Sequence, residues 1–466
     1  MNPRRLLAIL FALPALPAPC AAAADKPHLV YILADDLGWK DVGYHGGKIK
    51  TPHLDRLATE GLRLEKFYVQ PHSTQTRAAL LTGRYPMRYG LQTLSLQPWS
   101  QYALPVDERL LPQALKEAGY RTAMIGKWHL GHAKKEWWPQ HRGFDYFYGS
   151  LHGDTDHLKK HNRLGEPDWH RNDQALKEEG FDVGLLARDA ANLIGKHSSA
   201  TPLFLLLSLP APLAPYAAPK ELLDRQRDIT DDNRRRYAAM VSALDDTVGL
   251  VVDALEKKRM LSETLIVFHS ATGGALPTRF ATGDGDVKKP AADNGPYSEG
   301  KGSLREGGIR VPAIAYWNGH IPAGHSIELM HVTDLYPTLL TLAGAKLAQA
   351  KPLDGLDQWA AISEGKPSPR KELLVNMEDS RGALISGLWK LIVFAAMPQK
   401  IELFNLNDDP SEENNKVEAE PERVRDMLRR LTEYAWEMAP SKYLEELQKA
   451  HKHDAPMVWG ENPVRP

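Results

Sequence analysis

One short apolar run constrains the fold of this chain more than any other feature. Residues 28–33 are almost entirely apolar and lead directly into Ala34, Asp35 and Asp36. A run of this length without polar alternation is typical of a strand buried on both faces, as in a parallel sheet covered by helices. Ligands of open α/β sheets bind beyond the carboxyl ends of such strands. The sequence therefore predicts that Asp35 and Asp36 belong to a functional site.

Further buried strands and amphipathic helices follow in alternation. The expected strands are residues 122–126, 202–208 and 264–270, and the expected helices are 51–61, 110–118, 183–196 and 232–258. Strands that alternate with helices predict an α/β, doubly wound sheet.

The pattern changes near residue 365, after a turn segment rich in proline and glycine at residues 364–370. Beyond it we expect short strands at 373–377, 388–394 and 401–405, a helix at 421–435, and a tail in the last fifteen residues. These features predict a catalytic domain over residues 25–365 and a small α+β subdomain over residues 366–466.

Residues 1–24 have the features of a secretory signal peptide. Arg4 and Arg5 precede a short apolar stretch, and small residues lead to Ala24. The stretch is too short for a transmembrane helix. We therefore expect a periplasmic or secreted protein with no membrane span after cleavage. It would also lack cysteine, because Cys20 is the only one in the chain.

The overall charge is nearly balanced, with 58 lysines and arginines against 59 aspartates and glutamates. No global field would attract nucleic acid or a membrane surface. An anionic substrate would have to be captured by a local cluster of cations.

Motifs spread over residues 26–430 give a specific resemblance, because they occur in a fixed order. The chain resembles the sulfatases of the alkaline phosphatase superfamily, most closely the arylsulfatase B type, and this implies a large mixed sheet sandwiched by helices. The motifs are Val30-Tyr-Ile-Leu-Ala-Asp-Asp-Leu-Gly38, Thr51-Pro-His-Leu-Asp-Arg-Leu57, Thr76-Arg-Ala-Ala-Leu-Leu-Thr-Gly-Arg84, Ile125-Gly-Lys-Trp-His-Leu-Gly131, Arg142-Gly-Phe-Asp145, residues 300–312, Gly387-Leu-Trp-Lys-Leu391 and Leu403-Phe-Asn-Leu406.

The resemblance implies a known chemistry. A cysteine or serine converted to formylglycine attacks the sulfur, and calcium held by an Asp-Asp pair and an Asp-Asn pair polarises the sulfate. Several residues occupy the positions of the family's catalytic residues. Asp35 and Asp36 match the first metal-binding pair, and Arg77 matches the arginine beside the nucleophile. Lys127 and His129 match the lysine and histidine of the Gly-Lys-Trp-His motif, and Lys301 matches the lysine near the end of the domain.

Other parts of that machinery are replaced. The modification motif reads Ser73-Thr-Gln-Thr-Arg77, the second metal pair is Ala271 and Thr272, and Leu213 stands where a sulfate-binding histidine is expected. Calcium prefers about six to eight oxygen ligands, several of them charged. We therefore expect no cofactor, neither calcium nor formylglycine, and only Asp35 and Asp36 as ligands if a metal is retained.

The remaining groups suit a different hydrolysis. A carboxylate surrounded by cations stays ionised, whereas a second acidic group with fewer cations beside it can keep its proton and act as a general acid. Cleavage of a glycosidic bond requires two groups of these two kinds. The expected catalytic residues are Asp35, Asp36, Ser73 and His129, and the substrate is an acidic carbohydrate that contains uronate or sulfate. The expected substrate-binding residues are His72, Arg77, Lys127, Lys301, Asp154, Asp156 and His157.

Two alternatives stay open: a glycan-binding pseudosulfatase without turnover, and a conventional arylsulfatase with a variant motif. Trp137 and Trp138 are candidates to stack on sugar rings. His269 is interpreted as structural, and Asp293-Asn294 as part of a loop rather than a displaced metal pair.

Overall fold

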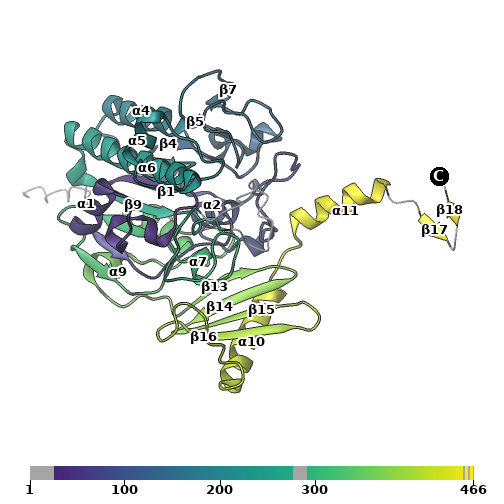
Figure 1. Cartoon of the computed structure of the whole chain (residues 1–466). Helices are drawn as coiled ribbons and strands as arrows, with labels where there is room; N and C mark the ends of the chain where they lie inside the picture. Colours follow the sequence, from purple (N-terminus) through teal and green to yellow (C-terminus); the bar gives the residue numbers. More distant parts are fainter. Residues whose placement is uncertain (1–25, 277–290, 455–456, 460–461, 465–466) are drawn as a thin grey trace, which may run out of the picture.

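The computed structural model describes residues 26–276, 291–454, 457–459 and 462–464, and its centre is a large mixed sheet (Figure 1). The predicted signal peptide lies outside the described residues. From edge to edge the ten strands are β11 (Gly324–Ser326), β2 (Leu62–Leu64), β10 (Ala313–Tyr316), β9 (Thr264–Ser270), β1 (His28–Ala34), β8 (Leu203–Ser208), β4 (Arg121–Gly126), β5 (Tyr146–Gly149), β6 (His170–Arg171) and β7 (Gln174–Ala175).

The predicted first strand is the centre of this sheet. Every residue of β1 is buried, and β1 pairs in parallel with β8 on one side and β9 on the other. Strand β4 continues the parallel set, whereas β10 runs antiparallel to β9, so the sheet is mixed. Because parallel strands end at one edge, the residues that follow β1, β4, β8 and β9 meet there.

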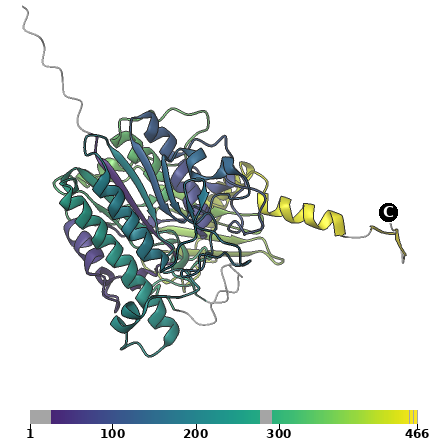
Figure 2. The same cartoon turned by 90° about the horizontal axis from the view of Figure 1, so that it is seen from above.

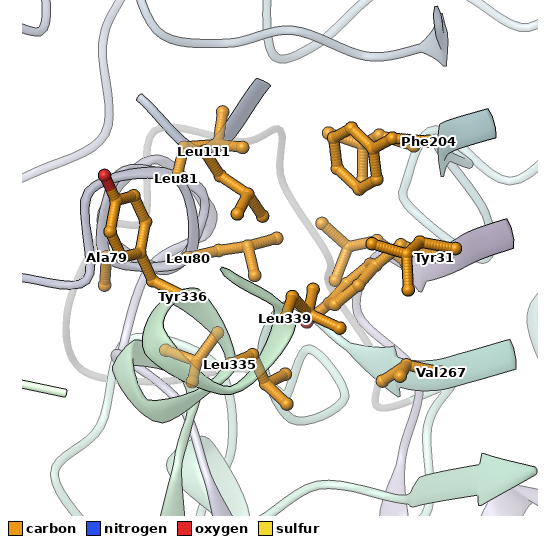
Figure 3. Close-up of a cluster of buried hydrophobic side chains, with 14 of the residues drawn as sticks. Tyr31, Ala79, Leu80, Leu81, Leu111, Phe204, Val267, Leu335, Tyr336 and Leu339 are labelled. Atoms are coloured by element: carbon orange, nitrogen blue, oxygen red, sulfur yellow. The ribbon is translucent and has the colours of Figure 1, made fainter. Parts of the chain in front are cut away.

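Helices cover both faces of the sheet (Figure 2). One face of the sheet packs against α1, α4 and α6, and the other packs against α2, α3 and α8. On this second face, leucines of α2, α3 and α8 contact Tyr31, Phe204 and Val267 of the strands (Figure 3). The bounds are α1 (Pro52–Glu60), α2 (Ser73–Thr82), α3 (Leu111–Glu117), α4 (Asp182–Lys196), α5 (Lys220–Arg225), α6 (Asp232–Lys257), α7 (Glu306–Ile309), α8 (Leu335–Leu342) and α9 (Trp359–Glu364).

The C-terminal part is a separate antiparallel sheet, formed by β13 (Glu372–Met377), β14 (Arg381–Ser386), β15 (Trp389–Phe394) and β16 (Lys400–Asn405), with α10 (Pro421–Trp436) on one face. The sequence predicted three of these strands and missed β14. The expected tail is partly structured: α11 (Lys442–Asp454) projects from the body, followed by a hairpin of β17 (Met457–Trp459) and β18 (Asn462–Val464) (Figure 1). No helix among the described residues is both long and apolar enough to cross a membrane.

A buried ion cluster joins the two sheets close to Lys301. The ammonium of Lys390 in β15 lies 3.0 Å from the carboxylate of Glu306 in α7 and 2.9 Å from that of Glu412, and the side chains of Lys390 and both glutamates are inaccessible to solvent. Arg381 of β14 donates to the carbonyl of Gly302, at 2.8 Å. The small sheet therefore fixes the loop that carries Lys301.

Replacing Lys390 with methionine should destabilise the fold strongly. It removes the cation from buried Glu412 and leaves Glu306 with Arg310, 3.4 Å away, and loss of one partner of a buried ion pair costs about 3–5 kcal/mol. Urea denaturation of K390M measures this loss. The control is K400M on neighbouring β16, where Lys400 is largely exposed and pairs with Glu402, and a change within about 0.5 kcal/mol is expected. Equal stability of the two variants would contradict a structural role for the cluster.

Candidate functional site

The first carboxylate of the site is bound by two cations. The ammonium of Lys127, directly after β4, lies 2.5 Å from Oδ2 of Asp35, and Nη1 of Arg77 in α2 lies 3.5 Å from Oδ1. All three side chains are buried. Burial alone opposes ionisation of Asp35, but Arg77, Lys127 and Lys301 outweigh it and hold the pKa of this carboxyl well below its usual range. Asp35 is therefore an anion at neutral pH.

The second carboxylate has a different set of partners. Oδ2 of Asp36 lies 2.9 Å from the ammonium of Lys301, and Oδ1 accepts a hydrogen bond of 2.9 Å from the hydroxyl of Thr272. The backbone of Asp36 is left-handed, with φ of 65°. Such a conformation costs a residue with a side chain on the order of 1–3 kcal/mol and persists only where its surroundings impose it. The fold therefore stabilises a strained conformation that turns Asp36 toward Lys301.

A serine–histidine contact adjoins the carboxylates. Oγ of Ser73, the first residue of α2, lies 3.2 Å from Nδ1 of His129, and Nε2 of His129 lies 3.0 Å from the carbonyl oxygen of Leu96. A carbonyl oxygen can only accept, so Nε2 carries the proton and Nδ1 of the neutral ring accepts from the Ser73 hydroxyl. His129 is thereby oriented as a base toward Ser73. Its own φ of 58° is a second left-handed position at the site.

Arg77 links these two parts of the site. Its Nη1 donates to the carbonyl of Ser73 at 3.3 Å, and its Nη2 donates to the hydroxyl of Ser208, at the end of β8, at 3.1 Å. Three partners in the site were not predicted from the sequence: the hydroxyl of Thr272 as a donor to Asp36, the hydroxyl of Ser208 and the carbonyl of Leu96. Thr272 carried a signal, since it lies within the altered strand-end motif, whereas a backbone carbonyl leaves none.

The donor set does not fit calcium. The site offers two carboxylates, each already bonded to a lysine, while Ala271 has no donor atom in its side chain and Thr272 donates to Asp36. Calcium requires about six to eight oxygens, several of them charged. Within the described ranges no group of three or more histidine, cysteine, aspartate or glutamate side chains is arranged to hold a metal ion.

The segment that follows β5 contributes less than the sequence predicted. His157 is fully buried, and its two ring nitrogens lie 2.9 Å from Asp182 and 2.9 Å from the carbonyl of Leu213, so it braces the loop of Leu213 and does not face a substrate. Asp156 accepts from the backbone of residues 158 and 159 and stabilises a turn.

Asp154 is the remaining acidic candidate of that segment. Asp154 pairs with Arg163. The residue before it, Gly153, packs against the ring of His129, because a β-carbon added at Gly153 would lie only 2.2 Å from that ring. Asp154 therefore lies near the serine–histidine contact. His72 is buried directly before Ser73.

His269 and Asn294, which the sequence predicts to be structural and not part of the site, make structural hydrogen bonds. His269 contacts the hydroxyl of Tyr31 and lies 2.7 Å from the carbonyl of Ser270, and burial lowers its pKa to about 3. Asn294 makes its hydrogen bonds with Gly274 and Glu299 and does not act as part of a metal pair.

Replacing Gly153 with alanine should displace the ring of His129, because the added methyl group has no room beside it. A crystal structure of G153A should show Nδ1 of His129 beyond hydrogen-bonding distance of Ser73. The control is G195A in α4, where a β-carbon meets nothing within 4 Å and the helix gains up to about 1 kcal/mol. An unmoved His129 ring in G153A would show that the glycine does not position it.

Calcium should leave the melting temperature of the wild-type protein unchanged, and so should a chelator, because the donor set is incomplete. Restoring the second pair with A271D and T272N should make the melting temperature rise with calcium, since a ligand that binds the folded state stabilises it. Differential scanning fluorimetry over a calcium series measures both. A calcium-dependent shift of the wild-type protein would contradict the fit described above.

Comparisons with known proteins identify the family of this chain. Residues 27–345 match the family model "Sulfatase". Mouse arylsulfatase J is 34% identical, with 95% of this chain and 81% of that protein covered, and rat N-acetylgalactosamine-6-sulfatase is 36% identical, with 77% and 70% covered. Among solved structures, Ps i-CgsB in complex with k-i-k-neocarrahexaose is 33% identical and has a TM-score of 0.80. The match covers 89% of this chain and 94% of that chain. The PsFucS1 sulfatase of Pseudoalteromonas sp. is 28% identical, with a TM-score of 0.75 and 90% and 91% covered. This chain belongs to the sulfatase family.

Proposed function

We propose that this protein is an exported hydrolase of acidic carbohydrates that works without calcium or formylglycine and cleaves a glycosidic bond. Sulfatase-family relatives are hydrolases, and several act on sugars by name. One observation carries the proposal: Asp35 and Asp36 are held by Lys127, Arg77, Lys301 and Thr272, in an arrangement that leaves no complete metal site.

The absence of the modification motif argues against sulfate transfer. An unmodified Ser73 that attacked sulfur would be left as a sulfate ester, because it lacks the second hydroxyl that expels sulfate from a hydrated aldehyde. The ionised carboxylate of Asp35, in contrast, can attack an anomeric carbon or stabilise its positive charge. This chemistry needs no metal.

In the proposed cleavage of the glycosidic bond, His129 transfers the protons. In its protonated form it gives a proton, directly or through the Ser73 hydroxyl 3.2 Å away, to the sugar oxygen that leaves. The glycosidic C–O bond breaks, Asp35 holds the anomeric centre, and neutral His129 then takes a proton from the water that attacks that centre. Lys127, Lys301 and Arg77 would attract the anionic group of the sugar.

A specific observation also supports a second candidate, a binding protein without turnover. Each site carboxylate already has a lysine partner within 3 Å, so attraction between these charges stabilises the site without a reaction. The left-handed backbones of Asp36 and His129 favour the enzyme, because strain of this kind concentrates at active sites.

The experiment is a screen of purified protein against uronate-containing and sulfated oligosaccharides, with free sulfate and reducing ends measured together. The proposal predicts new reducing ends without sulfate release. Release of sulfate with intact sugar chains would identify a conventional sulfatase, and saturable binding without either product would identify the binding protein.

For the oligosaccharide that is cleaved, D35N and H129Q should each lower kcat by about 100-fold or more, as expected for loss of a nucleophile or an acid–base group. D246N is the matched control, because Asp246 pairs with Arg225 at the surface, and it should keep full activity. Melting temperatures establish that each variant is folded. Unchanged turnover in folded D35N and H129Q would rule out the proposed site.

A further inference from the structure

An aromatic groove between residues 99–107, Trp137 and α11 takes no part in the chemistry above. It has a volume of about 830 Å³, and its wall contains Trp99, Tyr102 and Trp137, with the first turns of α11 on the opposite side. Trp99 is 52% exposed, which is unusual for so large an apolar side chain, and Trp137 is nearly buried. The groove therefore presents a free aromatic ring.

One stretch of chain, residues 96–104, connects the groove with the contact between Ser73 and His129. The carbonyl of Leu96 bonds to His129, and Trp99 follows three residues later, so their α-carbons are at most about 11 Å apart. Farther along, the amide of Leu104 donates to the carbonyl of Leu130, the residue after His129, at 3.0 Å. Residues 96–104 thus run from the serine–histidine contact to the groove.

Hydrogen bonds preform the wall of the groove. Arg142 is buried and donates to the carbonyls of Leu104 and Pro105, at 2.9 and 3.0 Å. Glu446 of α11 accepts from the amide of Gln101, at 2.6 Å. A site whose shape exists before binding loses little conformational entropy when a ligand enters.

The chemistry of the groove matches a sugar ring. A pyranose has a face of C–H groups that packs on an aromatic ring, and its rim of hydroxyl groups donates to carboxylate and amide oxygens. Such oxygens line the groove at Gln101, Asp107 and Glu445.

We infer that the groove around Trp99 binds a sugar unit of an oligosaccharide whose acidic unit occupies the site of Asp35 and Asp36. The inference rests on the proposed function and extends it: the substrate is a chain of several sugars and not a single acidic sugar. Trp99 supplies the platform on which the additional unit stacks.

Binding measurements on the full chain test this inference. In an H129Q background, which prevents turnover, isothermal titration calorimetry gives the affinities for disaccharides and hexasaccharides prepared from iota-carrageenan and from chondroitin sulfate. Adding W99A should weaken binding of the hexasaccharide about tenfold and leave the disaccharide within about twofold, whereas W99F, which keeps an aromatic face, should retain most of the affinity. The matched control is W436A, because Trp436 is 80% exposed on α10 and lies outside the groove.

Each outcome has a separate meaning. Equal effects of W99A on both lengths, or no effect, would overturn the inference and leave the proposed function intact, since both sugars would still bind. No binding of any of the four sugars by the H129Q protein or the wild type would overturn both. A change in the sedimentation coefficient of W99A without a change in affinity would show that the groove contacts a second copy of the chain, and would also overturn the inference.

Discussion

The pairing of two adjacent carboxylates with lysines from distant parts of the chain is the interaction on which this site depends. Asp35 and Asp36 leave the central strand together, yet Asp35 bonds to Lys127 after β4 and Asp36 bonds to Lys301 before α7. Two buried anions side by side would repel each other strongly in a medium of low polarity. The cations remove this repulsion, a task that the resemblance assigns to calcium in other members of the family.

The rest of the fold serves to hold those partners in place. The parallel strands β1, β4 and β8 bring Asp35, Lys127 and Ser208 to one edge, and the small C-terminal sheet fixes the Lys301 loop through Arg381 and the Lys390 cluster. Lys301 is therefore positioned by residues some 80 to 110 positions later in the chain. The small sheet thus contributes to the site through these contacts with the Lys301 loop.

The sequence predicted much of this architecture, because buried parallel strands leave a strong local signal. The central strand, β4, β8 and β9 are confirmed within one residue. The structure also brings Asp35 into contact with Arg77 and Lys127, Asp36 with Lys301, and Ser73 with His129. Histidines and aspartates in a loop suggest a substrate site, which is why the sequence predicts substrate contacts for His157 and Asp156. Only the structure reveals that His157 binds Asp182 and the Leu213 carbonyl. The roles of Thr272 and Leu96 depend on contacts across the fold, which no local pattern encodes.

The central claim is that the lysine ammonium groups take the place of a metal ion between the carboxylates and the rest of the site. A crystal structure of the protein grown in millimolar calcium, with anomalous diffraction measured, tests it most directly. Nζ of Lys127 should lie against Asp35 and Nζ of Lys301 against Asp36, with no anomalous peak between them. An anomalous peak coordinated by Asp35 and Asp36, with the two lysines displaced, would contradict it.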